Sequence, residues 1–155
     1  MRLALAGALA LAGCGGSPCG ESEATVTRVI DGDTIELEGG VRIRYLLVDT
    51  PEVSGGAECF GDNARQMNSD LVLGKTVQIH YDVQCTDNFG RTLAYVTVDG
   101  QEVNTLLVQR GYACVLFIPP NGEARREEFE NLELDAKNAR RGLWGSCNPL
   151  PPACS

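Results

Sequence analysis

Short stretches in which apolar and polar residues alternate, separated by glycine-containing turns, occupy much of the chain between residues 25 and 118. Such stretches, rich in β-branched residues, predict strands that bury one face. The Gly39-Gly40 pair is typical of a two-residue hairpin turn between two of them, and Pro119-Pro120 ends the last one. The strands are expected over 25–30, 34–37, 41–48, 76–83, 92–98 and 113–118.

Three other segments carry apolar residues at helical spacing. They cover 62–73, 103–110 and 123–141, and glycine follows the first two as a helix-ending residue. In the third segment six acidic residues come early and the last basic residues, Lys137, Arg140 and Arg141, come late, which complements the helix dipole and so indicates stability rather than function. Together the elements predict an α+β domain: a five-stranded OB-type β-barrel with three packed α-helices.

The first 13 residues have the layout of a secretory signal, with a basic residue, an apolar run and small residues before Cys14. Leu11-Ala12-Gly13-Cys14 resembles the lipobox of bacterial lipoproteins, which implies cleavage before Cys14 and attachment of lipid to it. We therefore expect an exported protein of the cell envelope, anchored to the membrane through lipid on Cys14; soluble secretion is the alternative. We expect signal residues at 1–13, an acylated Cys14 and flexible tether over 14–24, a folded domain over 25–147 and a Pro/Cys-rich tail over 148–155.

Composition narrows the classes of protein that fit. The 155 residues are 43% hydrophobic, which supports one domain with a real core. The formal net charge is −8, and loss of Arg2 with the signal leaves 12 basic against 21 acidic residues, or −9, which disfavours a binder of nucleic acid that acts through bulk positive charge. A single His excludes a zinc site of the two-His kind. Export makes the six cysteines other than Cys14 candidates for disulfides.

Acidic residues gather at one end of the first predicted hairpin. With Gly39-Gly40 as the turn, Asp33 would lie opposite Leu46 and Asp49 opposite Ile30. Asp31 adds a third carboxylate, and three acids at one strand end repel one another unless a hard cation or a basic partner neutralises them. The alternative is that Asp31 and Asp33 only form a turn between strands.

Two arginines and one glutamate extend this group. Arg44 lies in a strand about to become apolar, where a long cation needs an anionic partner or ligand. Arg91 follows Gly90 in a loop that can face the same end of the barrel, although a solvated loop arginine is the alternative for it. Paired arginines beside carboxylates suit phosphoryl chemistry, and Glu52, on a loop stiffened by proline, could deprotonate an attacking water.

Three short segments of the sequence resemble the conserved segments of a known protein family. Residues 29–34 (VIDGDT), 44–52 (RYLLVDTPE) and 86–95 (TDNFGRTLAY) resemble the signature blocks of the staphylococcal nuclease (thermonuclease) family, in family order and with family-like spacing. The likeness extends from about residue 25 to residue 144. It implies an OB-type barrel and a calcium-dependent phosphodiesterase of DNA and RNA whose products carry 3′-phosphates.

The resemblance also implies a role for each matching residue. Asp33 and Asp49 would bind Ca²⁺ through their carboxylates and Thr50 through its backbone carbonyl, with Asp31 behind these ligands. The residues implied to act on the phosphodiester are two arginines that hold the phosphate and a general base: Arg44, Arg91 and Glu52. Oxygen ligands of this kind suit calcium.

The chain departs from the family pattern where substrate is bound. Asn88-Phe89 stands where the family has Lys-Tyr, and the segment 115–120 offers only Phe117 in place of the tyrosines that flank the bound base. Phe89 and Phe117 are therefore the expected contacts with substrate, through stacking. Within the family frame we expect the disulfides Cys59–Cys85, Cys114–Cys147 and Cys19–Cys154, with free thiols as the alternative.

The leading hypothesis is an exported, monomeric nuclease acting on single-stranded or denatured DNA and RNA. A noncatalytic OB-type module that binds nucleic acid is the main rival, because such domains often bind oligonucleotides without cutting them. A calcium-stabilised structural lipoprotein is a third reading, but it leaves both arginines without a role. The presence of Arg44, Glu52 and Arg91 together with the acidic cluster separates the hypotheses, since binding alone requires no general base.

Overall fold

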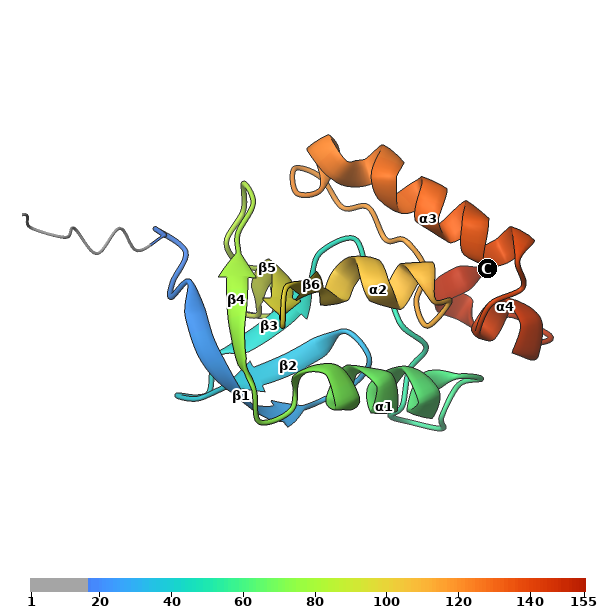
Figure 1. The fold of residues 1–155 in the computed structure, drawn as a ribbon, viewed down its shortest axis with the longest axis horizontal. Helices are drawn as coiled ribbons and strands as arrows, with labels where there is room; N and C mark the ends of the chain where they lie inside the picture. Colours follow the sequence, from blue (N-terminus) through green and yellow to red (C-terminus); the bar gives the residue numbers. More distant parts are fainter. Residues whose placement is uncertain (1–16) are drawn as a thin grey trace, which may run out of the picture.

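The alternating strands close into a barrel in the computed structural model, which describes residues 17–155 (Figure 1). Their order is β3-β2-β1-β4-β5, and a parallel pairing of β3 with β5 closes the barrel, so the predicted fold class is confirmed. A two-residue strand, β6, extends β5 as a hairpin. The strands are β1 (Glu23–Val29), β2 (Thr34–Leu37), β3 (Arg42–Tyr45), β4 (Thr76–His80), β5 (Thr92–Val98) and β6 (Gln101–Glu102).

The barrel interior is filled by the apolar residues of each alternating strand. In β4, Val77 and Ile79 are buried while His80 faces solvent, as the alternation predicts. Ile35 of β2 and Ile43 of β3 are fully buried and directly paired across the antiparallel ladder. Each side chain of this kind contributes about 1.5–3 kcal/mol through burial, so the interior holds the strand ends at fixed positions.

The helices are α1 (Gly61–Val72), α2 (Val103–Gln109), α3 (Arg126–Asn138) and α4 (Leu143–Ser146), with 3-10 turns at Glu123–Arg125 and Pro152–Cys154. Helix α2 packs against α1, α3 and β5 and lies between α1 and α3 in Figure 1. Buried Asn104 fixes α2 to the barrel: its Nδ2 donates to the Leu46 carbonyl at 3.0 Å, and its Oδ1 accepts from the Val96 N–H at 3.0 Å. None of the helices described here is long and apolar enough to cross a membrane.

The first hairpin differs by one residue from the prediction. Its loop contains three residues, Glu38 to Gly40, and Leu37 donates its N–H to the Val41 carbonyl. Thr34 therefore pairs with Arg44. The backbone carbonyl of Asp33 accepts the N–H of Tyr45, so Asp33 does not lie opposite Leu46. The two-residue reading was wrong because both glycines have positive φ, which a longer turn can also use.

Four other predicted elements are shorter than expected. The strand over 76–83 ends at His80. The strand over 41–48 ends at Tyr45, because Leu47 adopts φ 60° and turns the chain. The strand over 113–118 is reduced to one bridge, between Cys114 and Asp49, since β3, β4 and β6 already pair with β5. The helix over 123–141 begins as a 3-10 turn and ends at Asn138, and Arg140 reverses the chain with φ 53°.

All three predicted disulfides, Cys59–Cys85, Cys114–Cys147 and Cys19–Cys154, are paired differently in the structure. The disulfides are Cys19–Cys85, Cys59–Cys147 and Cys114–Cys154, with Cα–Cα distances of 5.1, 5.9 and 5.4 Å. The reason is spatial: α4 carries Cys147 next to the loop that leads into α1, while the segment around Cys19 lies beside the β4–β5 loop. The predicted tether is also shorter, because Glu23 and Ala24 belong to β1. The predicted signal segment 1–13 and Cys14 lie outside the described residues.

Candidate active site

The turn between β1 and β2 places two of the predicted acids. Asp31 accepts the Asp33 N–H through Oδ1 at 3.1 Å, which closes the turn around Gly32. A Cβ on Gly32 would lie 2.6 Å from the Thr50 side chain. Only glycine therefore lets the loop after β3 approach this turn. The acidic turn and the loop that carries Asp49 and Thr50 thus meet at one end of the barrel.

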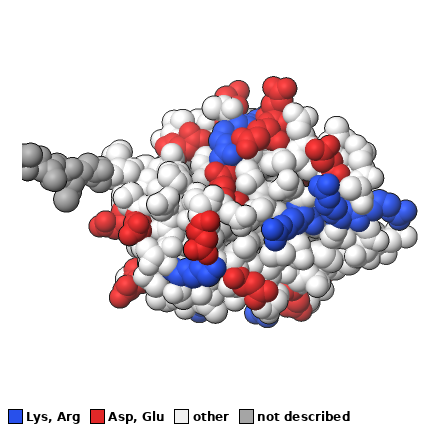
Figure 2. All heavy atoms as spheres, viewed as in Figure 1, with Lys and Arg blue, Asp and Glu red and all other residues white. Residues whose placement is uncertain are grey.

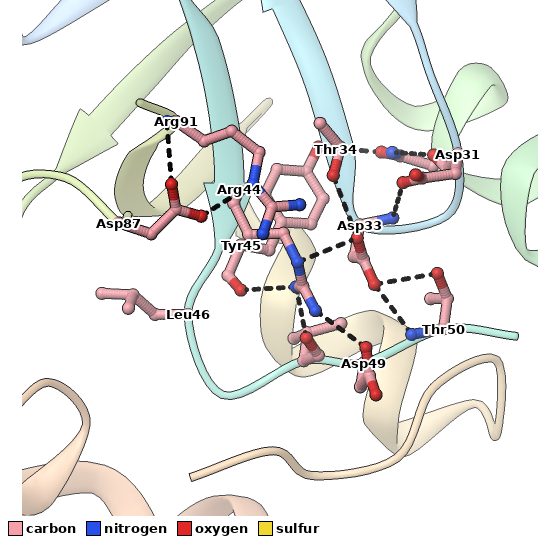
Figure 3. A network of polar contacts seen from close by, with 12 residues as sticks. Asp31, Asp33, Thr34, Arg44, Tyr45, Leu46, Asp49, Thr50, Asp87 and Arg91 are labelled. Atoms are coloured by element: carbon pink, nitrogen blue, oxygen red, sulfur yellow. Dashed lines mark hydrogen bonds and ion pairs between the residues drawn. The ribbon is translucent and has the colours of Figure 1, made fainter. Parts of the chain in front are cut away.

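The Asp33 carboxylate joins these two segments (Figure 3). Its Oδ2 accepts the backbone N–H of Thr50 at 2.8 Å and the Thr50 hydroxyl at 3.0 Å. Its Oδ1 accepts the Thr34 hydroxyl at 3.1 Å and lies 3.2 Å from Arg44 Nε. Each oxygen of this buried carboxylate thus has at least one polar partner, which fixes its position.

Arg44 bridges Asp33 and a second acid. Its Nη2 donates to Asp49 Oδ1 at 2.8 Å, and its Nη1 donates to the carbonyls of Tyr45 and Val48. Those carbonyls converge because the chain turns at Leu47. Its left-handed backbone conformation costs free energy for any residue other than glycine. Arg44 is only 9% exposed and its guanidinium contacts two carboxylates, so the expectation that this cation has anionic partners is confirmed.

Negative charge still exceeds positive charge here. Burial, with the charge of Asp33 added, raises the pKa of Asp31 to about 6. Burial also raises the pKa of Asp49 to about 6; Arg44 opposes this shift, while Asp33 and Glu52 add to it. The ionised carboxylates are therefore costly in this environment, and an added cation would relieve that cost.

Arg91 is oriented by Asp87, a residue outside the site predicted from the sequence. Asp87 Oδ1 accepts the N–H groups of Phe89 and Arg91 at 2.9 and 3.0 Å, and Oδ2 accepts Arg91 Nε at 2.7 Å. Burial acts to raise the pKa of Asp87, but these hydrogen bonds outweigh it and hold the pKa below its usual value. The loop arginine is thus fixed rather than free, and the aspartate before Asn-x-Gly was the sequence signal.

A cavity of about 410 Å³ lies beside the two arginines. Arg44, Arg91 and Asp87 line one part of it, and Phe89 and Asn88 another. Phe89 is 84% exposed, with the Arg91 guanidinium 5.6 Å from its ring centroid. The remaining lining includes apolar side chains from two loops: Leu46, Leu47, Leu116, Ile118 and Pro119.

Phe117 does not line this cavity, in contrast to its predicted contact with substrate. Its ring packs on the core and lies under Arg126, whose guanidinium carbon is 4.8 Å from the ring centroid. Leu116 and Ile118, its neighbours, face the cavity instead. The placement has a simple cause, since alternate residues of this extended segment face opposite sides.

Glu52 lies on the exposed part of the loop between β3 and α1. Its backbone N–H donates to Glu58 Oε2 at 2.9 Å, and its carbonyl accepts the Glu58 N–H at 2.9 Å. A Cβ on Gly61 would lie 2.5 Å from the Glu52 carbonyl oxygen, so glycine at the start of α1 lets this loop pack closely. The Glu52 carboxylate itself makes no hydrogen bond or ion pair with any residue from 17 to 155.

Asn68 holds the acidic turn in place from α1, and it too lies outside the site predicted from the sequence. It is fully buried on α1, its Oδ1 accepts the Tyr45 hydroxyl at 2.8 Å, and its Nδ2 donates to the Asp31 carbonyl at 3.0 Å. The available signal was its spacing, because Ala64 and Val72 flank it at four residues on the buried face of the helix. A polar residue on such a face needs internal partners.

No three acidic, His or Cys side chains of residues 17–155 already surround a position for a metal ion. The donor chemistry nevertheless fits a hard cation, since Asp33, Asp49 and Asp31 supply carboxylate oxygens at one place and the charge of Arg44 alone does not balance them. The set contains no soft or nitrogen ligand. Calcium or a cation of similar hardness is therefore the class of metal that these residues could hold.

Comparison with known proteins gives consistent matches. The profile of the family described as staphylococcal nuclease homologue matches residues 42–146. The chain is 35% identical to SPbeta prophage-derived endonuclease YokF and 36% identical to Endonuclease YncB, both of Bacillus subtilis (strain 168), over 79% and 77% of this chain and 44% and 60% of those proteins. It therefore spans about half the length of these two relatives.

A third relative matches almost end to end. An uncharacterized endonuclease of Escherichia coli O157:H7 is 36% identical over 144 residues, which cover 86% of this chain and 84% of that protein. The residues that match the family profile, 42–146, include β3, the loop with Asp49 and Glu52, and the loop with Arg91. This chain belongs to the staphylococcal nuclease homologue family.

Proposed function

We propose that the protein is a calcium-dependent nuclease that hydrolyses phosphodiester bonds of DNA, RNA or both. The observation that carries the proposal is that Arg44 and Arg91 line one cavity directly beside the Asp33 and Asp49 carboxylates. Two guanidinium groups can donate paired hydrogen bonds to one phosphate. The names of the relatives, all endonucleases, support the same reaction class.

In the proposed mechanism, Arg44 and Arg91 hold the scissile phosphate and offset the charge that grows on its oxygens. Asp87 fixes Arg91 in the loop, so little ordering is needed when substrate binds. Glu52 takes a proton from the attacking water; the oxygen adds to phosphorus, the bond to the 5′ oxygen breaks, and that oxygen takes a proton from solvent. A 3′-phosphate and a 5′-hydroxyl result.

The proposed cation site comprises Asp33, Asp49 and the Thr50 carbonyl, with Asp31 behind them. When bound, calcium would supply positive charge next to the phosphate. Asp33 and Thr50 are already fixed to each other by two hydrogen bonds, so this part of the site is formed before any ligand binds. Asp49 has one oxygen engaged by Arg44 and the second without a hydrogen bond from a described residue.

Single-stranded or denatured nucleic acid is the proposed substrate. The cavity walls of Phe89, Leu116 and Ile118 can contact a base placed next to the phosphate. Asn88 supplies no charge there, and the net charge of −8 gives no general attraction for polyanions, so affinity should depend on the cation. Export with a lipid anchor at Cys14 is part of the proposal and rests on the amino-terminal sequence and on the disulfides.

A cleavage assay tests this function. The oxidised full chain is incubated with a single-stranded oligonucleotide, with calcium or with a chelator, beside the variant Glu52→Gln and the control Glu38→Gln, which changes an exposed turn residue. New 3′-phosphate ends should appear only with calcium, and Glu52→Gln should lose at least about 100-fold in rate. Cleavage that survives chelation or Glu52→Gln contradicts the mechanism; binding without cleavage favours the noncatalytic module.

A further inference from the structure

Three arginines stand apart from the other basic residues because they take part in no ion pair within residues 17–155. They are Arg110, Arg140 and Arg141, and all three are exposed. Every other described lysine or arginine pairs with a carboxylate: Arg28, Arg42, Arg44, Arg65, Lys75, Arg91, Arg125, Arg126 and Lys137. Among the lysines and arginines of residues 17–155, positive charge without an ion-pair partner is therefore confined to these three positions.

The three positions lie together where α2 and α3 end. Arg141 Nη1 donates to the Gln109 carbonyl at 3.0 Å, and Leu143 donates its N–H to the Gly111 carbonyl at 2.8 Å. Figure 2 shows the basic side chains of this region as one band over the carboxyl ends of the two helices. We call Arg110, Arg140 and Arg141 the arginine band.

Arg140 occupies a backbone conformation that favours glycine. Its φ is 53°, and around it the N–H groups of Arg140 and Arg141 donate to the carbonyls of Lys137 and Ala136, at 3.0 and 2.9 Å, as in a Schellman helix end. A side chain at this position costs stability. The helix dipole does not require it, because Lys137 already places a cation in the last turn. Arg140 therefore places a positive charge at a position where the backbone conformation favours glycine.

The band adjoins the loop that carries the proposed general base. Cys59, in that loop, is joined to Cys147 directly after α4. The ring of Phe60 packs on the ring of Tyr112, two residues after Arg110, with centroids 5.2 Å apart. A nucleic-acid strand that left the cleavage site along this loop would therefore come next to the arginine band.

We propose that the arginine band binds backbone phosphates of single-stranded nucleic acid outside the cleavage site. The inference rests on the proposed function and extends it, because it makes the enzyme prefer substrates long enough to reach the band. Arginine suits this ligand, since its guanidinium matches phosphate geometry. An anionic membrane fits less well: the chain near residue 20 and the band lie at opposite ends of the long axis in Figure 1.

The test measures binding with a chelator present, so that no cleavage occurs. Fluorescence anisotropy gives the affinity for labelled oligothymidylates of about 4 and about 20 nucleotides. The oxidised full chain is compared with the double variant Arg110→Gln/Arg140→Gly. The variant should bind the long oligonucleotide about 5- to 10-fold more weakly at low salt, and its salt slope should fall by about 1.4, or about 0.7 for each lost phosphate contact. Affinity for the short one should not change.

Lys75→Gln/Arg126→Gln is the matched control, because it removes two cations that are ion-paired elsewhere. The inference is overturned if both double variants lose the same affinity for the long oligonucleotide, or if Arg110→Gln/Arg140→Gly loses none. So does a loss of binding to phosphatidylglycerol vesicles with DNA binding unchanged, which would identify a membrane surface. Arg140→Gly alone should raise the Tm, so weaker binding cannot reflect unfolding. Failure of wild-type cleavage with calcium would reject the proposed nuclease while leaving this binding result intact.

Discussion

The Nε of Arg91 lies 2.7 Å from Oδ2 of Asp87, and the other oxygen of the same carboxylate accepts two backbone N–H groups of the loop that carries this arginine. One side chain therefore fixes both the shape of the loop and the direction of the guanidinium. Arg91 lines the cavity next to Arg44 because of this arrangement.

Asp87→Ala should lower kcat/KM for a single-stranded oligonucleotide by about 10- to 100-fold. Arg91 then moves freely, and even a small displacement of a group that positions the substrate slows the reaction. Asp87→Asn keeps acceptors for the backbone N–H groups and should recover part of the loss. Asp70→Ala, a change of an exposed aspartate, is the control and should have no effect. Full activity in Asp87→Ala would show that the loop orients Arg91 without this contact.

Much of the barrel could be predicted because alternation and burial coincide. In β4 the pattern places Val77 and Ile79 inside, and the structure agrees. The first hairpin could not be placed to one residue, since Gly39 and Gly40 fit either a two- or a three-residue loop and only tertiary packing selects between them. The segment after Ala113 has strand-like composition, but β5 has no free edge left for it.

The site was predictable where charge had to be neutralised and unpredictable where a residue acts through geometry. Arg44 in an apolar strand required acidic partners, and Asp33 and Asp49 are those partners. Asn68 and Asp87 act by hydrogen bonds between segments distant in sequence, which no local pattern reveals. The disulfide pairs depend in the same way on which loops the fold brings together.

Asn68→Ala should destabilise the fold by about 2–4 kcal/mol, because the buried hydroxyl of Tyr45 and the carbonyl of Asp31 both lose their partner. Urea unfolding measures this change, and Asn63→Ala, at an exposed position of the same helix, is the control. A loss no larger than that of the control would mean that water replaces the amide without cost.

Non-reducing peptide mapping should find Cys59 linked to Cys147. The bond closes a sequence separation of 88 residues, so removing it in Cys59→Ser/Cys147→Ser should cost about 4 kcal/mol of stability through the greater freedom of the unfolded chain. The same variant frees the loop that carries Glu52 from α4, so activity should fall further than for Cys19→Ser/Cys85→Ser. A peptide that joins Cys59 to Cys85 would contradict the fold of this loop.

Asp31→Asn should stabilise the calcium-free protein at neutral pH. The pKa of Asp31 is raised to about 6 in the folded state, from an ordinary value of 3.8. The folded protein therefore holds a proton there that the unfolded chain releases, and the contribution of this group to stability falls as pH rises between those two values. Above pH 6 the variant should be more stable by on the order of 1–3 kcal/mol; below pH 4 the difference should vanish.

Asparagine keeps the oxygen that accepts the Asp33 N–H, so the turn is preserved in this variant and the comparison isolates charge. Unfolding in urea with a chelator, from pH 4 to pH 8, gives the profile, and Asp70→Asn is the exposed control. Saturating calcium should reverse the order above pH 6, because the cation stabilises the wild-type carboxylates more than the amide. Parallel pH profiles for wild type and variant would show that Asp31 titrates as an ordinary surface carboxyl.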